Sequence, residues 1–309
     1  MIMNRMMISN ILSILLFSLK CGKYKAFSFH IYRATDTKCL QSSLKLSKSL
    51  IKKTASTPLS STIQSDTSVG IDSTFPKHKS KILFPGGGIF FYWQIGVVQY
   101  LRDNNYNLDN TSLAGASAGA LSATLTATNV DFVKATELAL QLAREAHVWD
   151  RPLGLQGVWG SLIEGWLDEL LPNDAPSIVN ERLALLITPV PSFGKTRVTT
   201  FENKEELIQA NMASVHLPIF LDGKLTNNFR NKPHIDGSVF AKQTDYFVDY
   251  DENDILTIDW YRDPVMNEKS NDFVKLVSED GIWGMLEQGK KFAIGMEERG
   301  EFELLHKLH

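Results

Sequence analysis

A serine between two glycines, placed between two regular segments, constrains the fold of this chain more than any other feature. The motif is Gly115-Ala-Ser117-Ala-Gly119, a G-x-S-x-G pattern. The apolar residues 112–116 predict a buried strand, and the alanine-rich residues 118–127 predict a helix. The chain therefore turns sharply at Ser117, and the flanking glycines avoid a clash there. The serine hydroxyl then lies at the carboxyl end of a strand and near the positive end of a helix dipole. A glycine-rich helix start that packs closely on the sheet is the structural alternative.

A second glycine motif precedes the first and has the same surroundings. Gly86, Gly87 and Gly88 lie between the short apolar run 81–84 and the apolar residues 89–103, which predict a strand and a buried helix. Glycines leave backbone N–H groups free to face an oxyanion, because no side chain shields them. No Gly-Lys-Ser/Thr follows, and the spacing does not fit a dinucleotide fingerprint. An oxyanion-binding loop and a flexible turn are the two interpretations left open.

A third motif places a carboxylate at a turn. His234-Ile-Asp236-Gly237-Ser238 follows a strand-like stretch, so Asp236 can face a serine that the fold brings close. His234 stands two residues before Asp236, and a strand would put both side chains on one face. The similar pair Asp222-Gly223 is interpreted as a turn only.

Strands and helices alternate along the chain after residue 80, which is typical of an α/β fold with a parallel sheet. We find no internal repeat and predict one domain, residues 79–309. Its further expected helices are 131–148, 202–213 and 273–296, and its further expected strands are 183–190, 197–201, 219–221 and 255–260.

In this order the three motifs resemble those of the patatin-like phospholipases. They are Gly86-Gly-Gly, Gly115-Ala-Ser-Ala-Gly119 and Ile235-Asp-Gly237, and the resemblance covers roughly residues 81–260. It implies a three-layer α/β fold, with a mostly parallel sheet and helices on both faces. It also implies a lipid acyl hydrolase of the phospholipase, galactolipase or lipase type, which cleaves carboxylic esters of membrane or storage lipids.

The resemblance assigns a role to each motif. Ser117 corresponds to the nucleophile, Asp236 to the general base and Gly86–Gly88 to the oxyanion hole, with Gly115 and Gly119 flanking the nucleophile elbow. The reaction passes through an acyl-enzyme and needs no histidine and no cofactor. The chain departs from the family pattern at Ile89–Trp93, which stand where a basic residue is usual, and at Ser238, which follows Asp236-Gly237.

We expect an acyl lipid as substrate, the surface of a membrane or lipid droplet as a peripheral partner, and no nucleic acid, because the net charge is -3. Residues 81–309 contain no cysteine and no close histidine cluster, so we expect no metal. An apolar helical stripe suits either a lipid-facing lid or the core. It comprises Trp159, Leu162, Ile163, Trp166, Leu167 and Leu170.

Two other functions stay open. An α/β-hydrolase esterase needs a histidine after its acid, and only His306 and His309 follow Asp236. A patatin-fold protein that binds or stores lipid without catalysis is the other.

The first 78 residues differ in character from the rest of the chain. Residues 1–80 carry 12 Lys/Arg and the three acids Asp36, Asp66 and Asp72. A short apolar run, Ile8–Leu19, fits a signal peptide, and the Ser/Thr/Lys-rich stretch after it fits a transit peptide. The junction Lys25–Phe29 resembles the cleavage site of two-part plastid presequences. We therefore expect residues 1–78 to be a disordered presequence for the plastid, with the secretory pathway as the alternative.

Overall fold

Residues 80–308 are described by a computed structural model of the chain. The expected presequence, residues 1–78, lies outside the described residues, so its boundary with the domain predicted for residues 79–309 stays a prediction. No helix within residues 80–308 has both the length and the apolar character needed to cross a membrane.

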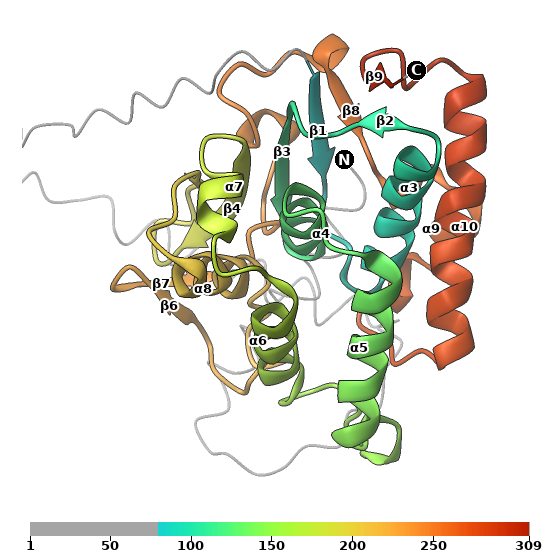
Figure 1. Cartoon of the computed structure of the whole chain (residues 1–309). Coiled ribbons are helices and arrows are strands. Elements are labelled where there is room, and N and C mark those ends of the chain that lie inside the picture. Colours follow the sequence, from blue (N-terminus) through green and yellow to red (C-terminus); the bar gives the residue numbers. More distant parts are fainter. Residues whose placement is uncertain (1–79, 309) are drawn as a thin grey trace, which may run out of the picture. The chain divides into compact units, whose positions relative to one another are not determined.

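A seven-stranded sheet forms the centre of the described part (Figure 1). Its order is β6-β7-β4-β3-β1-β8, and β5 also pairs with β4. The neighbours β4, β3, β1 and β8 run parallel, whereas β5, β6 and β7 add antiparallel pairs. The strands are β1 Ser80–Phe84, β3 Thr111–Ala116, β4 Leu183–Pro189, β5 Thr196–Val198, β6 Asn227–Phe229, β7 Lys232–Ile235 and β8 Ile255–Thr257. The predicted mostly parallel sheet is confirmed.

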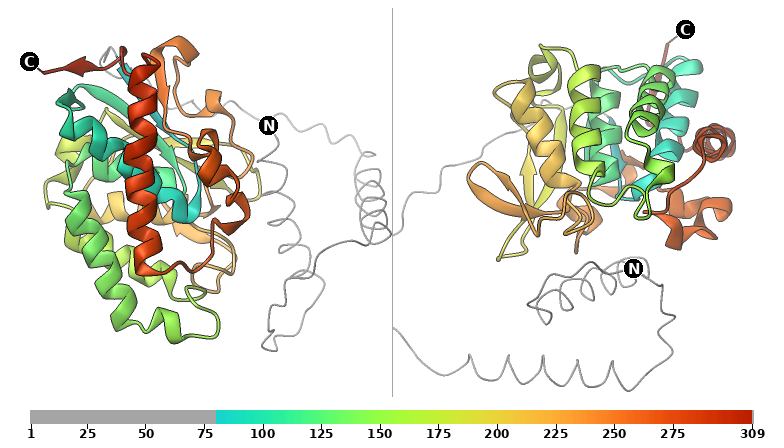
Figure 2. Two further views of the ribbon diagram at one scale, coloured as in Figure 1. Left: turned by 90° about the vertical axis from the view of Figure 1, so that its right-hand side faces the viewer. Right: turned by 90° about the horizontal axis from the view of Figure 1, so that it is seen from below.

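Helices cover one face of this sheet. The buried helix α4 lies on β3 and β1, between α3 and α8, as an alanine-rich helix without a polar face requires. The longest helix, α10, packs along α3 (Figures 1 and 2). The helices are α3 Phe91–Asp103, α4 Ala118–Ala127, α5 Phe132–Glu145, α6 Trp159–Leu170, α7 Ala175–Val179, α8 Lys204–Ser214, α9 Pro264–Asn267 and α10 Glu279–Glu298.

A different layer covers the other face of the sheet. Tyr246 and Phe247 pack there against Leu83, Ala114 and Leu186 in a second apolar cluster. They follow the short 3-10 helix η3, Gln243–Asp245. The sheet thus lies between two layers, and the layer on its second face is built from a 3-10 turn and loops where helices were expected. This cover lets β1, β3 and β4 be buried on both faces.

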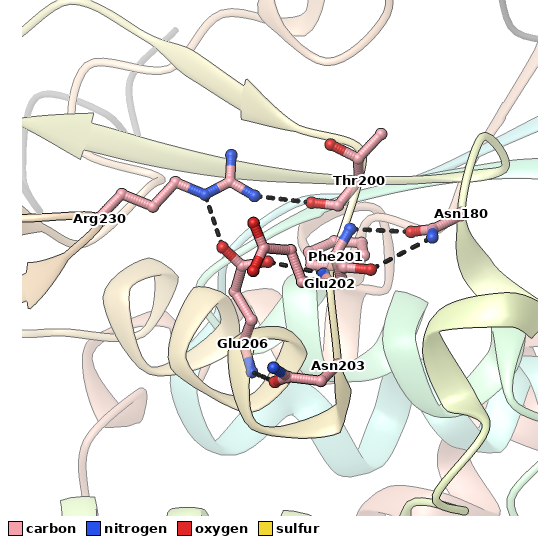
Figure 3. Close-up of polar contacts among 7 residues, drawn as sticks. All are labelled: Asn180, Thr200, Phe201, Glu202, Asn203, Glu206 and Arg230. Atoms are coloured by element: carbon pink, nitrogen blue, oxygen red, sulfur yellow. Dashed lines mark hydrogen bonds and ion pairs between the residues drawn. The ribbon is translucent and has the colours of Figure 1, made fainter.

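The hairpin β6–β7, which leads to Asp236, is tied to the start of α8. Its turn residues Arg230 and Asn231 have φ values of 48° and 58°, the left-handed conformation of a tight hairpin turn. The Arg230 guanidinium donates to Glu206 Oε1 at 2.8 Å and to the Thr200 carbonyl at 2.8 Å (Figure 3). Glu206 Oε2 in turn accepts the Glu202 N–H at 2.7 Å. This network fixes the hairpin against the helix.

Most predicted elements are present, with shifted ends, but the predicted strand 219–221 is wrong. These residues form a turn, in which Ile219 has a φ of 68° and its N–H donates to the Lys224 carbonyl at 2.7 Å. Pro218 before this segment and Asp222-Gly223 after it favour the turn over extended pairing. The predicted helix 273–296 begins later, at Glu279, where the Ser278 side chain accepts the N–H of Gly281.

Candidate active site

Ser117 occupies the sharp turn between β3 and α4 that its motif predicts. Its backbone has φ 56° and ψ −131°, a conformation that a residue with a side chain rarely adopts. Its N–H does not enter the helix and instead donates to Ser214 Oγ at 3.0 Å. Ser214 Oγ itself donates to the Leu186 carbonyl at 2.7 Å, which fastens the turn to β4. The serine is therefore held at a sharp corner of the backbone, with only 4% of its surface accessible.

The glycines beside Ser117 are required by close packing. A Cβ on Gly119 would lie 2.0 Å from the Phe84 carbonyl oxygen, and one on Gly115 would lie 2.0 Å from the Gly119 carbonyl oxygen. Both obstacles are backbone atoms, which cannot move aside by rotating a side chain. The close approach of α4 to β1 depends on both glycines.

Strand register brings Asp236 next to Ser117. Ala116 pairs with Leu186 on one side of β4, and Ile235 pairs with Thr188 on its other side. Asp236 follows Ile235 directly, just as Ser117 follows Ala116. Two residues that are 119 positions apart in the chain thus meet across the end of one strand.

The Asp236 carboxylate is buried and only partly paired. Oδ1 accepts the N–H of Ser238 at 2.8 Å and its hydroxyl at 2.6 Å. Oδ2 has no fully formed hydrogen bond to any residue in the range 80–308. The Ser117 hydroxyl nevertheless lies close enough to favour the charged carboxylate. Oδ2 is thus the carboxylate oxygen that remains available as an acceptor.

Burial dominates the acidity of this group. Desolvation raises the pKa of Asp236 above its ordinary value, while the Ser117 and Ser238 hydroxyls, the Ser238 N–H and the Lys195 charge oppose that rise. A carboxylate with a raised pKa is a stronger base than an exposed aspartate. The pKa of Asp236 is therefore shifted in the direction that makes this carboxylate a better proton acceptor.

The glycine loop, Gly86–Gly88, lies beside Ser117 and Ser238. A Cβ on Gly86 would stand 3.2 Å from Ser117 Cβ and 2.8 Å from Ser238 Cβ. The Trp260 indole donates to the Gly86 carbonyl at 3.0 Å and fixes the loop. Within the described chain no acceptor takes the N–H of Gly87 or Gly88, whereas the next N–H, of Ile89, donates to Phe273 O at 2.8 Å.

Two histidines and one aspartate that the sequence singled out, His234, His306 and Asp222, form no hydrogen bond with Ser117 or Asp236. His234 Nδ1 contacts the Lys232 carbonyl at 2.8 Å, and its ring packs on Phe229, so it does not pair with Asp236. His306 lies in β9, His306–Lys307, which pairs with β2, Tyr106–Asn107, before the amino end of β3. Six strand residues at about 3.3 Å each separate that end from Ser117. His309 lies outside the described residues, and Asp222 forms a turn, as predicted.

An apolar pocket opens at Ser117. Its wall comes from α4, α5, α6 and the residues before α10, and it contains no charged side chain. The indole N–H groups of Trp149 and Trp166 are turned away to the carbonyls of Val277 at 3.0 Å and Ala135 at 2.8 Å. The lining includes Ser117, Leu121, Leu140, Ala143, Trp149, Trp159, Leu162, Ile163, Trp166, Leu217, Leu276 and Ile282.

The apolar stripe of α6 belongs both to the core and to this pocket. Leu167 is fully buried and Trp166 nearly so, which agrees with core packing. Trp159, Leu162, Ile163 and Trp166 also line the pocket. The helix is thus a packed wall of the pocket.

Sequence reasoning missed the residues that support this site. Ser214 holds the Ser117 N–H, and Thr188 Oγ1 donates to the Asp236 carbonyl at 2.9 Å. Lys195 also lies beneath the Asp236 turn. No motif marks these positions, because each acts through the packing of distant segments.

The fold and the site define an α/β protein with a serine on a strained strand-to-helix turn, a buried carboxylate beside it and an apolar pocket. The sequence profile described as "Patatin-like phospholipase" matches residues 82–244. The chain belongs to the patatin-like phospholipase family.

Its relatives differ in the activities that their names state. It is 32% identical over 169 residues to patatin-like phospholipase domain-containing protein 2 of Bos taurus, a match that covers 53% of this chain and 35% of the relative. An omega-hydroxyceramide transacylase of Mus musculus is 29% identical over 54% of this chain and 28% of its own length. A 1-acylglycerol-3-phosphate O-acyltransferase of the same species is 25% identical, over 53% and 40%. The chain thus matches only about a third of the length of these relatives.

Among solved structures, VipD from Legionella pneumophila matches 58% of this chain and 49% of its own, at 14% identity and a TM-score of 0.35. A likeness at this level does not define a shared fold.

Proposed function

We propose that the protein is a lipid acyl hydrolase that cleaves carboxylic esters through Ser117 and Asp236. One observation carries this proposal: the serine on the strained turn lies beside a buried aspartate whose Oδ2 has no partner, and it lines a pocket without charged side chains. A storage or binding protein has no need of a strained serine beside a buried, only partly paired carboxylate, and both features cost stability.

The proposed chemistry has two steps with one proton acceptor. Ser117 Oγ attacks the ester carbonyl carbon while its proton moves to Asp236 Oδ2. The alcohol then leaves with that proton, and the acyl group stays on Ser117 as an ester. Water attacks the acyl-enzyme and gives a proton to Asp236, which returns it to Ser117 Oγ as the fatty acid leaves.

The oxyanion of each tetrahedral intermediate needs donors that are already in place. Gly87 and Gly88 supply N–H groups that no described residue accepts, and Ala118 supplies another as the first residue of α4. Gly86 keeps this loop against Ser117 because it has no side chain. We propose that these N–H groups form the oxyanion hole.

The apolar pocket supports a fatty acyl chain as the group bound at Ser117. A hydrocarbon chain in this pocket meets tryptophan, leucine and isoleucine side chains, and burial of each CH₂ contributes about 0.8 kcal/mol. The relatives of this chain are named as a phospholipase domain-containing protein, a transacylase and an acyltransferase. We propose water as the acceptor and an acylated membrane or storage lipid as the donor.

The test is fatty-acid release by the full chain from vesicles of phosphatidylcholine or galactolipid and from a triacylglycerol emulsion. We expect release from at least one of them, and a fall to near background in Ser117→Ala. Ser161→Ala is the control, because Ser161 lies on the outside of α6 and bonds only the Val158 carbonyl. Release that survives Ser117→Ala, or no release from any lipid, contradicts the proposal.

The chain's first 78 residues support a further proposal on location. Their excess of lysine and arginine, their apolar run and their Ser/Thr content fit a plastid presequence, with secretion as the alternative. Residues 1–78 fused to a fluorescent reporter should direct it to the plastid, and a uniformly cytosolic reporter contradicts this.

A further inference from the structure

Lys195 lies directly beneath the turn that carries Asp236. It follows the loop between β4 and β5, and its ammonium group reaches back under residues 236–239. It donates to Thr188 Oγ1 at 2.7 Å, to the Gly237 carbonyl at 3.3 Å and to the Val239 carbonyl. An ammonium group has three N–H bonds, so all of its donors are used on this turn and its support.

Lys195 is also linked to Asp236 through the hydroxyl of Thr188. Thr188 Oγ1, which accepts from Lys195, donates to the Asp236 carbonyl at 2.9 Å. Gly237 is so close to β4 that a Cβ on it would stand 1.7 Å from the Leu186 carbonyl oxygen. The turn is thus pressed on β4 from one side and held by Lys195, so the orientation of the carboxylate depends on the lysine.

The positive charge of Lys195 supports Asp236 as its hydrogen bonds do. Lys195 favours the ionised form of Asp236, against the desolvation that opposes it. Burial lowers the pKa of Lys195 to about 8, although the charges of Asp236 and Asp245 oppose the fall. The ionisation of Asp236 is thus influenced by the Ser117 and Ser238 hydroxyls, the Ser238 N–H and the Lys195 ammonium. The buried Tyr246 also interacts with Asp236, since the carboxylate charge raises the pKa of this tyrosine.

We propose that Lys195 is a positioning residue for catalysis, which holds the Asp236-Gly-Ser turn through three hydrogen bonds and keeps the carboxylate ionised. The role rests on the proposed function. It has a consequence for pH: above the pKa of Lys195 the amine is neutral, and both the clamp and the charge weaken. Activity therefore falls on the alkaline side through Lys195 and on the acid side through Asp236.

The experiment compares pH profiles of kcat and KM on a soluble ester, p-nitrophenyl butyrate, for the full chain and three variants. In the unaltered protein, kcat/KM should decline above about pH 8. In Lys195→Met, kcat should fall about tenfold with KM nearly unchanged. The acid limb should move up by about one pH unit, which corresponds to about 1.4 kcal/mol, because the variant loses the charge that favours the ionised Asp236 carboxylate. Lys195→Arg should restore most of kcat and remove the decline above pH 8, because a guanidinium stays protonated.

Lys232→Met is the matched control, because Lys232 lies exposed on β7, four residues before Asp236. Its profile should equal that of the unaltered protein. If Lys195→Met does not fold, the alkaline limb of Lys195→Arg alone decides. The role of Lys195 is overturned if the pH profile of Lys195→Met superimposes on that of the unaltered protein. It is also overturned if Lys195→Arg shows the same decline on the alkaline side as the unaltered protein. Ester cleavage that does not depend on Ser117 overturns the proposed function and this role with it.

Discussion

The two halves of the proposed active site are held by different forces. Ser117 is fixed by steric fit: its φ of 56° and the contact of Gly119 with the Phe84 carbonyl leave the backbone one arrangement. Asp236 is fixed by polar contacts with Ser238, Thr188 and Lys195. The serine turn therefore belongs to the packing that stabilises the fold, whereas the aspartate turn carries a buried charge that the fold tolerates. Substitutions of the glycines beside Ser117 should cost stability, and substitutions of Asp236 and its polar partners should cost activity.

The largest effect is expected at the serine turn. Gly119→Val puts a branched side chain against the Phe84 carbonyl oxygen, 2.0 Å from its Cβ position. Overpacking costs about 1–3 kcal/mol, and an obstacle made of backbone atoms places this variant at or above the top of that range. Urea unfolding should therefore show a much lower midpoint, or no folded protein.

Gly165→Ala is the matched control for that variant. It too is a glycine in a helix, but no atom lies within 4 Å of its Cβ position. It should raise stability by roughly 0.5–1 kcal/mol. An unchanged midpoint in Gly119→Val contradicts the steric account.

Asp236→Asn should show the opposite pattern. Loss of the base should lower kcat about 10²–10⁴-fold. The folded pKa of Asp236 is raised, so between its ordinary value and its folded value the unfolded chain binds fewer protons, and stability falls as pH rises. At pH 7 the variant lacks that penalty, and its Tm should be equal to or higher than that of the unaltered protein.

Thermal unfolding at pH 7 and at acid pH checks the sign. The Tm difference should shrink as the solution is acidified, because the buried carboxyl then becomes neutral. A variant that loses activity together with several degrees of Tm at pH 7 contradicts the comparison.

Ser238→Ala should act on the same carboxylate more mildly. It removes the 2.6 Å hydroxyl bond to Oδ1 but leaves the 2.8 Å N–H bond. A hydrogen bond to a charged group contributes about 1.5–3 kcal/mol, so the acid limb of kcat/KM should move up by about one to two pH units. The loss of kcat/KM should be smaller at pH 8 than at pH 6, because a higher pKa of Asp236 affects the acid limb. An acid limb that does not move refutes the assignment.

Arg230→Ala should have the smallest effect. The Arg230 side chain in its ion pair with Glu206 is about half exposed, and pairs open to solvent contribute about 0–1 kcal/mol. Urea midpoints should fall slightly, with a smaller difference in high salt, and kcat should stay within about twofold. A large loss of kcat would mean that the hairpin network of Figure 3 orients Asp236 more directly than its hydrogen bonds indicate.

The difference between the two turns also explains what the sequence could predict. Ser117 was identifiable because its constraint is local: two glycines, a strand before and a helix after. Asp236 was identifiable by its Asp-Gly turn and by the order of the motifs. Lys195 carried no such signal, since its partners Thr188, Gly237 and Val239 meet it only after β4, β5 and β7 have paired.

The central claim is that Ser117 and Asp236 act as a pair. The most direct measurement is the rate and position of labelling by a fluorophosphonate, followed by intact mass and peptide mapping of the full chain. The account predicts one label per chain, on Ser117, with a rate at least about 100-fold lower in Asp236→Asn. A label on another serine such as Ser214, or an equal rate in Asp236→Asn, would contradict it.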